Sequence, residues 1–176
     1  MEESVRIPKE RVGAVIGKNG QTKKDLEKHT GTRLKVDSES GEITIKGTEK
    51  NPIGFYNSLN IIKAIGRGFS PERAFMLTQE NYMLEIIDIK DELNATDKEL
   101  EQKKGRIIGT NGKTRNEIES KTDCAIAVYG KTVSIIGEAD KMHTAKKAID
   151  MLLSGATHSK VYGFLNKKQS FETFEI

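Results

Sequence analysis

Hydrophobic and polar positions follow one pattern twice along the chain. Apolar residues three and four apart indicate helices, and alternating apolar residues indicate half-buried strands. In the first copy this spacing predicts a strand over 4–7, a helix around 12–16, a helix over 21–29, a hairpin of strands over 33–37 and 42–46, and a helix from Asn51-Pro52 to Gly66 whose buried stripe is Ile53, Tyr56, Leu59 and Ile62.

The second copy repeats the order strand, helix, helix, strand, strand, helix. Its predicted elements are a strand over 83–89, helices over 97–108 and 113–121, hairpin strands over 125–129 and 132–136, and a helix over 138–153. A shift of 92 positions places nine residues of the first copy on identical residues of the second: Gly13 on Gly105, Ile16 on Ile108, Gly17 on Gly109, Asn19 on Asn111, Gly20 on Gly112, Thr22 on Thr114, Glu27 on Glu119, Thr30 on Thr122 and Val36 on Val128. An internal repeat of this kind indicates two copies of one structural unit.

Two further segments complete the chain. Ser70-Pro71 predicts the start of a connector helix, because serine caps a helix and proline is favoured at its first position. We therefore predict an α+β fold with a first domain and connector over 1–80, a second domain over 81–155 and a tail over 156–176. The pattern leaves open whether the tail docks on the body or on a partner.

The break between the first two helices of each copy carries the candidate chemistry. It reads Gly17-Lys18-Asn19-Gly20 in the first copy and Gly109-Thr110-Asn111-Gly112 in the second. Glycine has no Cβ, so such a loop can turn tightly and approach a sugar-phosphate backbone. The next helix starts at the loop, so its free N–H groups and positive dipole end face the same place. We predict that the pairs Val15-Ile16 and Ile107-Ile108, with the first hairpin strand, wall an apolar groove for unstacked bases.

The predicted RNA-binding residues are the two loops and the basic side chains near them: Gly17, Lys18, Asn19, Gly20, Lys23, Lys24, Arg33, Arg106, Gly109, Thr110, Asn111, Gly112, Lys113 and Arg115. A purely structural pair of helix breaks is the alternative interpretation. The second loop follows the longer helix and the more apolar strand, so we expect it to be the dominant contact.

The charge distribution agrees with this location. The net charge is only +3, but residues 6–35 carry nine basic and three acidic residues, and residues 103–121 carry six basic and two acidic ones. Residues 85–101 are acidic, with seven acidic and two basic side chains. No apolar run is long enough to span a membrane. The sequence starts without an apolar signal segment and has a single cysteine, Cys124, so we expect a cytoplasmic protein.

Other chemistry is not indicated. Gly112-Lys113-Thr114 resembles the end of a phosphate-binding P-loop, but Ile107 stands where that motif needs a glycine. The three histidines lie far apart without companion ligands, so we expect no metal and no cofactor. No nucleophile lies near a base at a suitable spacing, so we expect no catalysis.

Both copies resemble KH modules, the single-stranded nucleic-acid binders with a Gly-x-x-Gly loop. The hairpin and closing helix follow the loop, which resembles the type I arrangement, over about 4–65 and 83–154. The chain further resembles archaeal tandem-KH RNA-processing proteins, counterparts of the eukaryotic pre-ribosomal factor called partner of Nob, in the segments 66–74, 87–90, 104–109, 112–115 and 158–162. Generic KH modules have an aliphatic residue where this chain has Lys23 and Arg115, which shifts the expected grip toward phosphates.

That resemblance implies binding to single-stranded RNA near the 3′ end of small-subunit ribosomal RNA. It also implies action beside the endonuclease that trims this end, and contact with the translation initiation factor 2 alpha subunit. Two alternatives remain open from the sequence. One is a protein-interaction scaffold that uses the KH grooves and the tail, and the other is a KH subunit of an RNA-degrading complex.

Overall fold

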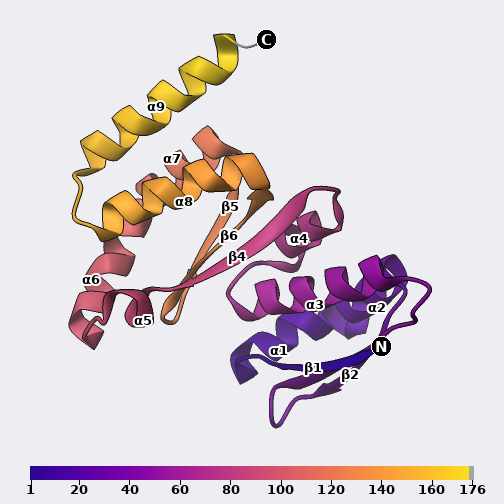
Figure 1. Ribbon diagram of the computed structural model, residues 1–176. Coiled ribbons are helices and arrows are strands. Elements are labelled where there is room, and N and C mark those ends of the chain that lie inside the picture. Colours follow the sequence, from indigo (N-terminus) through magenta and orange to yellow (C-terminus); the bar gives the residue numbers. More distant parts are fainter. Residues whose placement is uncertain (175–176) are drawn as a thin grey trace. The chain divides into compact units, whose positions relative to one another are not determined.

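The chain folds into two compact units, Met1–Glu80 and Asn81–Ile176. The structure is a computed structural model that describes the backbone of residues 1–174 and the side chains of residues 1–170. In each unit, helices cover one face of a three-stranded antiparallel sheet (Figure 1). Among the described residues, none of the helices combines the length and the apolar composition needed to cross a membrane.

The first unit has the predicted order of elements. They are β1 (Glu2–Arg6), α1 (Lys9–Ile16), a 3₁₀ turn (Lys18–Gly20), α2 (Gln21–Thr30), β2 (Arg33–Asp37), β3 (Glu42–Lys46), α3 (Pro52–Gly66), α4 (Pro71–Ala74) and a second 3₁₀ turn (Phe75–Thr78). The strand order is β1-β3-β2, so β3 is central. Leu34, Ile43 and Ile45 point from the sheet into the core below the helices.

The second unit repeats this plan and adds two helices. Its elements are β4 (Tyr82–Asp88), α5 (Ile89–Leu93), α6 (Asp97–Ile108), a 3₁₀ turn (Thr110–Gly112), α7 (Lys113–Thr122), β5 (Ala125–Tyr129), β6 (Thr132–Glu138), α8 (Ala139–Leu153) and α9 (His158–Phe174). The strand order β4-β6-β5 matches that of the first unit. The predicted α+β class and the repeated order of elements are therefore confirmed, whereas α5 was not predicted.

Capping side chains set several helix starts. The side chain of Asn51 accepts a hydrogen bond from the amide of Gly54 at 3.0 Å, and Pro52 is the first helical residue, as predicted. The Ser70 hydroxyl accepts from the amide of Arg73 at 3.3 Å. The connector helix is only one turn long before it tightens into the 3₁₀ turn.

The predicted buried stripe of α3 is wrong at its start. Ile53 is 73% exposed and Tyr56 is 54% exposed, whereas Phe55 is 3% exposed. The inward stripe instead runs through Phe55, Leu59 and Ile62, with the intervening Ile61 also buried. The first turn of α3 offers apolar residues at 53, 55 and 56, so helical spacing alone did not choose between two stripes.

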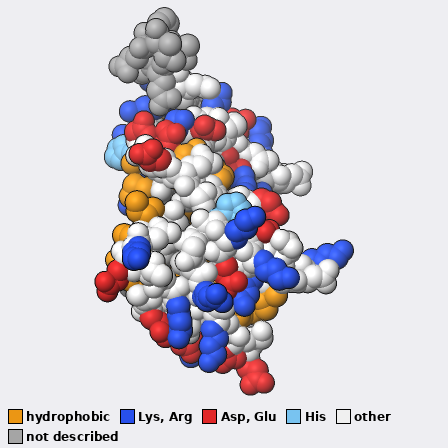
Figure 2. Space-filling view, turned by 90° about the vertical axis from the view of Figure 1, so that its right-hand side faces the viewer, with side chains coloured by type: hydrophobic (Ala, Val, Ile, Leu, Met, Phe, Trp, Pro, Cys, Tyr) orange, Lys and Arg blue, Asp and Glu red, His pale blue; other side chains and the backbone are white. Residues whose placement is uncertain are grey.

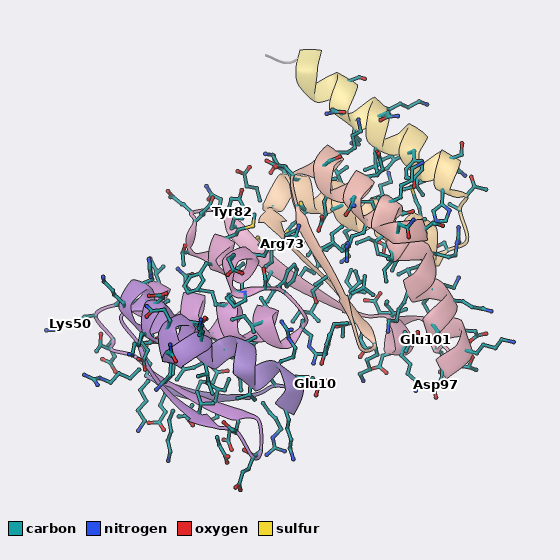
Figure 3. All side chains as sticks on the ribbon, turned by 180° about the vertical axis from the view of Figure 1, so that it is seen from behind. Glu10, Lys50, Arg73, Tyr82, Asp97 and Glu101 are labelled. Carbon is teal, nitrogen blue, oxygen red and sulfur yellow. The ribbon has the colours of Figure 1, made fainter. Side chains whose placement is uncertain are left out.

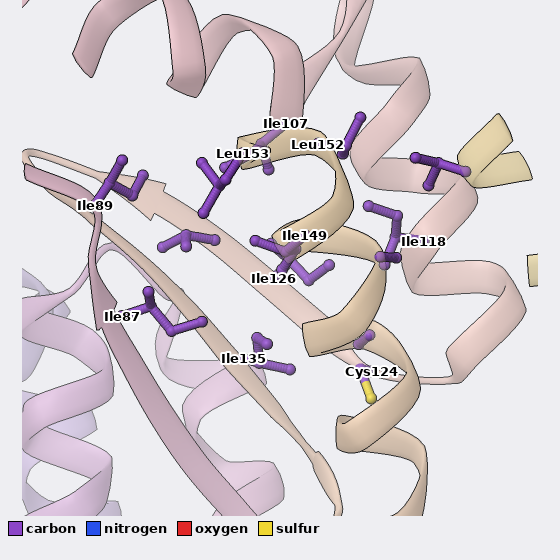
Figure 4. Packing of buried hydrophobic residues seen from close by; sticks show 14 of the residues in the cluster. Ile87, Ile89, Ile107, Ile118, Cys124, Ile126, Ile135, Ile149, Leu152 and Leu153 are labelled. Atoms are coloured by element: carbon purple, nitrogen blue, oxygen red, sulfur yellow. The ribbon is translucent and has the colours of Figure 1, made fainter. Parts of the chain in front are cut away.

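The core of the second unit is aliphatic (Figure 4). Ile107 of α6, Ile118 of α7 and Ile149 of α8 are fully buried against Ile135 of β6. Cys124 is 4% exposed at the edge of this core, and burial raises the pKa of its thiol. It is therefore a small core residue, as its position indicated.

The tail forms α9, which packs on α7 and α8 within the second unit (Figure 1). Val161 is 0% exposed and Leu165 is 1% exposed at this contact. The choice that the sequence left open is therefore decided in favour of docking on the body.

Candidate nucleic-acid interface

The two Gly-x-x-Gly loops have the same backbone conformation. Gly17 has φ 73° and ψ 175°, Asn19 has φ 54° and ψ 28°, and Gly20 has φ 72° and ψ 13°. The corresponding values in the second loop are 73° and 175°, 55° and 28°, and 75° and 12°. Three of the four residues thus have positive φ, which glycine adopts freely and asparagine more readily than most residues.

The first glycine of each loop is required by space as well as by φ. A Cβ added to Gly17 would overlap Oγ1 of Thr22 and lie 2.8 Å from its backbone nitrogen. A Cβ added to Gly109 would overlap Oγ1 of Thr114 and lie 2.8 Å from its nitrogen. A threonine in the first turn of α2 or α7 therefore packs directly against the loop. Thr22 and Thr114 are identical in the two copies of the repeat, but the sequence alone did not indicate their role.

The second glycine of each loop is the N-cap of the following helix. Gly20 caps α2 and Gly112 caps α7, and a glycine offers no side chain to the first-turn amides. A Cβ on Gly20 would meet no heavy atom within 4 Å, so the backbone is open on that side. Gly112 is buried, and a Cβ there would meet the ends of the Arg115 and Asn116 side chains, at 3.3 and 3.9 Å. These helix starts can therefore bind an anion close to the main chain.

Most of the predicted basic residues lie at the surface near the loops. Lys18 and Lys113 are exposed in or directly after them, and Lys24 is exposed in the first turn of α2. Arg33 is exposed at the start of β2, which follows the end of the 10-residue α2 opposite the loop, so the structure does not bring it beside the loop. Lys23 is half-buried and lies 3.9 Å from the carboxylate of Glu27. On the face seen in Figure 2, Lys and Arg side chains are interspersed with Asp and Glu side chains.

The remaining predicted residues are divided between exposed and half-buried positions. Thr110 and Asn111 are exposed at the tip of the second loop, and Asn19 is exposed in the first. Arg115 is half-buried, with its guanidinium beside Gly112. Its buried Nε atom has no hydrogen-bond partner among the residues that the structure describes. The structure thus brings all of these side chains to the loops or to the first turn after them.

Arg106 is a correction to the predicted set. Its guanidinium donates a hydrogen bond of 2.8 Å to the carbonyl oxygen of Leu152 and another to that of Ala156. These carbonyls lie at and just after the end of α8, where backbone acceptors lack partners within the helix. Its side chain therefore stabilises the junction of α8 and α9, although it looked like part of the basic rim in the sequence.

The apolar wall is also narrower than predicted. Val15 and Ile107 are fully buried in their cores, so neither reaches the surface. Ile16 and Ile108 are half-buried and lie directly before the loops. Only the second residue of each aliphatic pair is therefore available to contact a base.

The acidic segment before the second loop lies away from it. Asp97 starts α6 and is hydrogen-bonded to Lys90 at 2.8 Å, and Figure 3 shows Asp97 and Glu101 at this end of the helix. The hydrogen bond and charge of Lys90 lower the pKa of Asp97. The loop follows the other end of this 12-residue helix, about 18 Å away. At that distance, near two Debye lengths in physiological salt, the carboxylate of Asp97 hardly weakens the positive potential at the loop.

Metal-ligating side chains do not gather elsewhere in the described part of the chain, where no three His, Cys, Asp or Glu residues form a possible metal site.

Comparison with known proteins agrees with the loop geometry. A model described as eukaryotic type KH-domain (KH-domain type I) matches residues 83–170, and a KH domain model matches residues 2–53. A KH domain-containing protein of Methanocaldococcus jannaschii is 46% identical over 95% of this chain and 74% of its own length. This chain belongs to the same family of tandem KH-domain proteins. The resemblance seen in the sequence is therefore confirmed, and each unit is a type I KH module.

Two further members of the KH family are relevant to function. The pre-rRNA-processing protein PNO1 of Phaeosphaeria nodorum is 27% identical over 76% of this chain, which spans 51% of that protein. A chain of the solved a/eIF2alpha–aDim2p–rRNA complex from Pyrococcus horikoshii OT3 is 45% identical. Its TM-score is 0.90, and the match covers 97% of this chain and 94% of that one. The chain thus spans about half the length of the fungal relative and nearly all of the archaeal one.

Proposed function

We propose that this protein is a non-catalytic factor that binds single-stranded RNA through its two Gly-x-x-Gly loops and acts in the processing of small-subunit ribosomal RNA. The observation that carries the proposal is the matching conformation of the two loops, each followed by a helix start without a side-chain cap. The names of the relatives support the RNA class, since one is a pre-rRNA-processing protein and another was solved in a complex with rRNA.

The loops bind the RNA backbone rather than its bases. Phosphate oxygens accept hydrogen bonds from the first-turn amides of α2 and α7, and the exposed Lys18 and Lys113 neutralise their charge. The open side of Gly20 lets a sugar-phosphate chain approach the main chain. A single strand fits this site because its bases are unstacked and can turn toward the half-buried Ile16 and Ile108.

The proposed RNA target is the 3′ region of small-subunit ribosomal RNA. The proposed protein partners are the endonuclease that trims this end and the alpha subunit of translation initiation factor 2, and the proposed location is the cytoplasm. The factor 2 partner is supported by the name of the archaeal complex, which contains that subunit. A scaffold role for the tail has less support, because Val161 and Leu165 are already buried within the second unit.

The test is direct binding of oligonucleotides with the 3′-end sequence of small-subunit ribosomal RNA. Gly20→Asp and Gly112→Asp place a carboxylate at each helix start, where it repels phosphate. Gly20→Asn and Gly112→Asn are matched controls, since asparagine has the same size, tolerates positive φ and carries no charge. We expect each Asp variant to bind less tightly than its Asn control, and the double Asp variant to lose most of its affinity.

The proposal fails if the double Asp variant stays folded by circular dichroism and binds RNA as tightly as the double Asn control. A duplex of the same sequence serves as the specificity control, and we expect it to bind more weakly than the single strand.

A further inference from the structure

Helix α9 contacts both sides of the second loop. The Nε2–H of His158 donates a hydrogen bond of 3.0 Å to the carbonyl oxygen of Arg106, in the last turn of α6. The hydroxyl of Tyr162 lies 3.1 Å from Oγ1 of Thr114, in the first turn of α7. The loop lies between these two attachment points. One turn of α9 therefore bridges the two helices that the loop joins.

The two rings form a single structure on α9. They are four residues apart in sequence, which places them on the same face of the helix. Their centroids lie 6.4 Å apart with an interplanar angle of 26°, so the rings are stacked. Val161 and Leu165 bury the adjacent face of α9 against α7 and α8. The position of both polar contacts is thus fixed by helix packing.

Thr114 is the side chain that packs against the loop. Its Oγ1 occupies the space that a Cβ on Gly109 would need. Thr114 is 2% exposed, whereas Thr22, its counterpart at the first loop, is half-buried. The contact from Tyr162 is therefore made to the residue that packs against Gly109.

The first loop, which has no helix equivalent to α9 against it among the described residues, shows which backbone conformation the loop sequence adopts by itself. It has the same dihedral angles to within a few degrees, so the sequence alone sets the shape. The contribution of α9 is to restrain that shape. A restrained loop loses less conformational freedom when it binds a ligand, so the same contacts give a higher affinity.

We infer that Tyr162 and His158 are positioning residues of the second Gly-x-x-Gly loop, and that α9 makes this loop bind RNA more tightly than the first loop does. The inference rests on the proposed function. It assigns a role to the tail that uses no direct RNA contact, since both side chains are bonded to the protein.

The experiment uses the full chain with the Gly20→Asp substitution, so that RNA binding reports on the second loop. Tyr162→Phe and His158→Phe keep an aromatic ring and remove the two hydrogen bonds. Gln169→Ala is the control, because Gln169 lies on the same helix and accepts from Lys121 at the far end of α7. Affinity, its salt dependence and hydrogen exchange of the amides of residues 109–114 are measured together.

We expect each Phe variant to bind RNA about three- to tenfold more weakly, the range for one lost hydrogen bond. The salt slope stays unchanged, because no phosphate contact is lost. Exchange at 109–114 speeds up toward the rate of the first loop, and Gln169→Ala changes neither measurement.

Two results would overturn the inference. One is a Tyr162→Phe, His158→Phe double variant with unchanged exchange at 109–114. The other is faster exchange with unchanged RNA affinity, which would mean that restraint does not affect binding. If the protein with intact loops binds no single-stranded RNA, the proposed function fails instead. The exchange measurement then still decides whether α9 restrains the loop.

Discussion

The guanidinium of Arg106 donates to the carbonyl oxygen of Leu152 at 2.8 Å, and in the first unit Arg11, whose counterpart in the repeat is Lys103, donates to that of Ile65 at 2.8 Å. Each arginine lies on the helix that leads into a Gly-x-x-Gly loop, and each carbonyl lies at the end of the closing helix. Arg11 also donates to Phe69 in the connector, as Arg106 does to Ala156 before α9. In each unit an arginine side chain therefore joins three segments: the helix before the Gly-x-x-Gly loop, the closing helix, and the segment after the closing helix.

This role leads to a prediction for Arg106→Met, which keeps the aliphatic stem and removes the donors. We expect the second unit to lose about 1–3 kcal/mol of unfolding free energy, because the carbonyl of Ala156 loses its bond to the guanidinium and that of Leu152 is left with the backbone amide of Gly155, at 3.2 Å. The salt dependence of RNA binding should not change. Urea denaturation and a salt titration of affinity measure the two effects. A stable variant with a reduced salt slope would return Arg106 to the set of phosphate-binding residues.

The two glycines at the end of α6 should respond in opposite ways to alanine. Gly109→Ala forces a Cβ into Thr114 at positive φ, so we expect a loss of stability of about 1–3 kcal/mol. Gly105→Ala meets no heavy atom within 4 Å in the helix interior, so we expect a gain of up to about 1 kcal/mol. Urea denaturation of the pair tests both. Equal stability of the two variants would contradict the packing of Thr114 against the loop.

The exposed lysines at the loops should be visible in the salt dependence of binding. Each phosphate contact to a single strand contributes about 0.7 to the slope of log affinity against log salt. We expect Lys18→Ala and Lys113→Ala each to lower the slope by about that amount. Lys98→Ala is the control, because Lys98 is also exposed but lies in the first turn of α6, away from the loop. A slope that falls equally in all three variants would mean that net charge, not the loop, determines binding.

The repeat in the sequence was sufficient to predict the order of elements and the position of both loops. Helical and alternating spacing are local, and glycines and prolines mark the ends of elements, so Asn51-Pro52 and Ser70-Pro71 gave correct helix starts. The shared Gly-x-x-Gly pattern also predicted the turn between the first two helices of each unit.

The sequence could not predict where a side chain points when that direction depends on contacts with segments distant along the chain. The sequence suggested that Arg106 is an exposed basic residue, because the carbonyl oxygens that accept its hydrogen bonds lie 46 and 50 residues further along the chain. The tail gave an apolar pattern, but its contact with Thr114 depends on how α9 packs on α7 and α8. In α3, Phe55 rather than Tyr56 is the buried ring, and it lies against Gly47, which follows β3.

One further identity in the repeat gains a physical meaning in the fold. Oε1 of Glu27 accepts a hydrogen bond from the amide of Leu34 at 2.7 Å, and Oε1 of Glu119 accepts from that of Ile126 at 2.8 Å. β2 and β5 are edge strands, so their outward amides lack a partner strand. Each glutamate ties the edge strand to the helix that starts at the loop.

We therefore expect Glu119→Ala to lower the unfolding free energy by about 1–3 kcal/mol, because it leaves a partly buried amide unsatisfied. Glu119→Gln keeps an acceptor oxygen and should cost less. Glu117→Ala, two residues away on α7, is the control for helix propensity. Urea denaturation gives the stability, and hydrogen exchange at Ile126 reports on the bond itself. If Glu119→Ala leaves that amide as protected as Glu117→Ala does, the amide has another acceptor and the glutamate does not hold the strand.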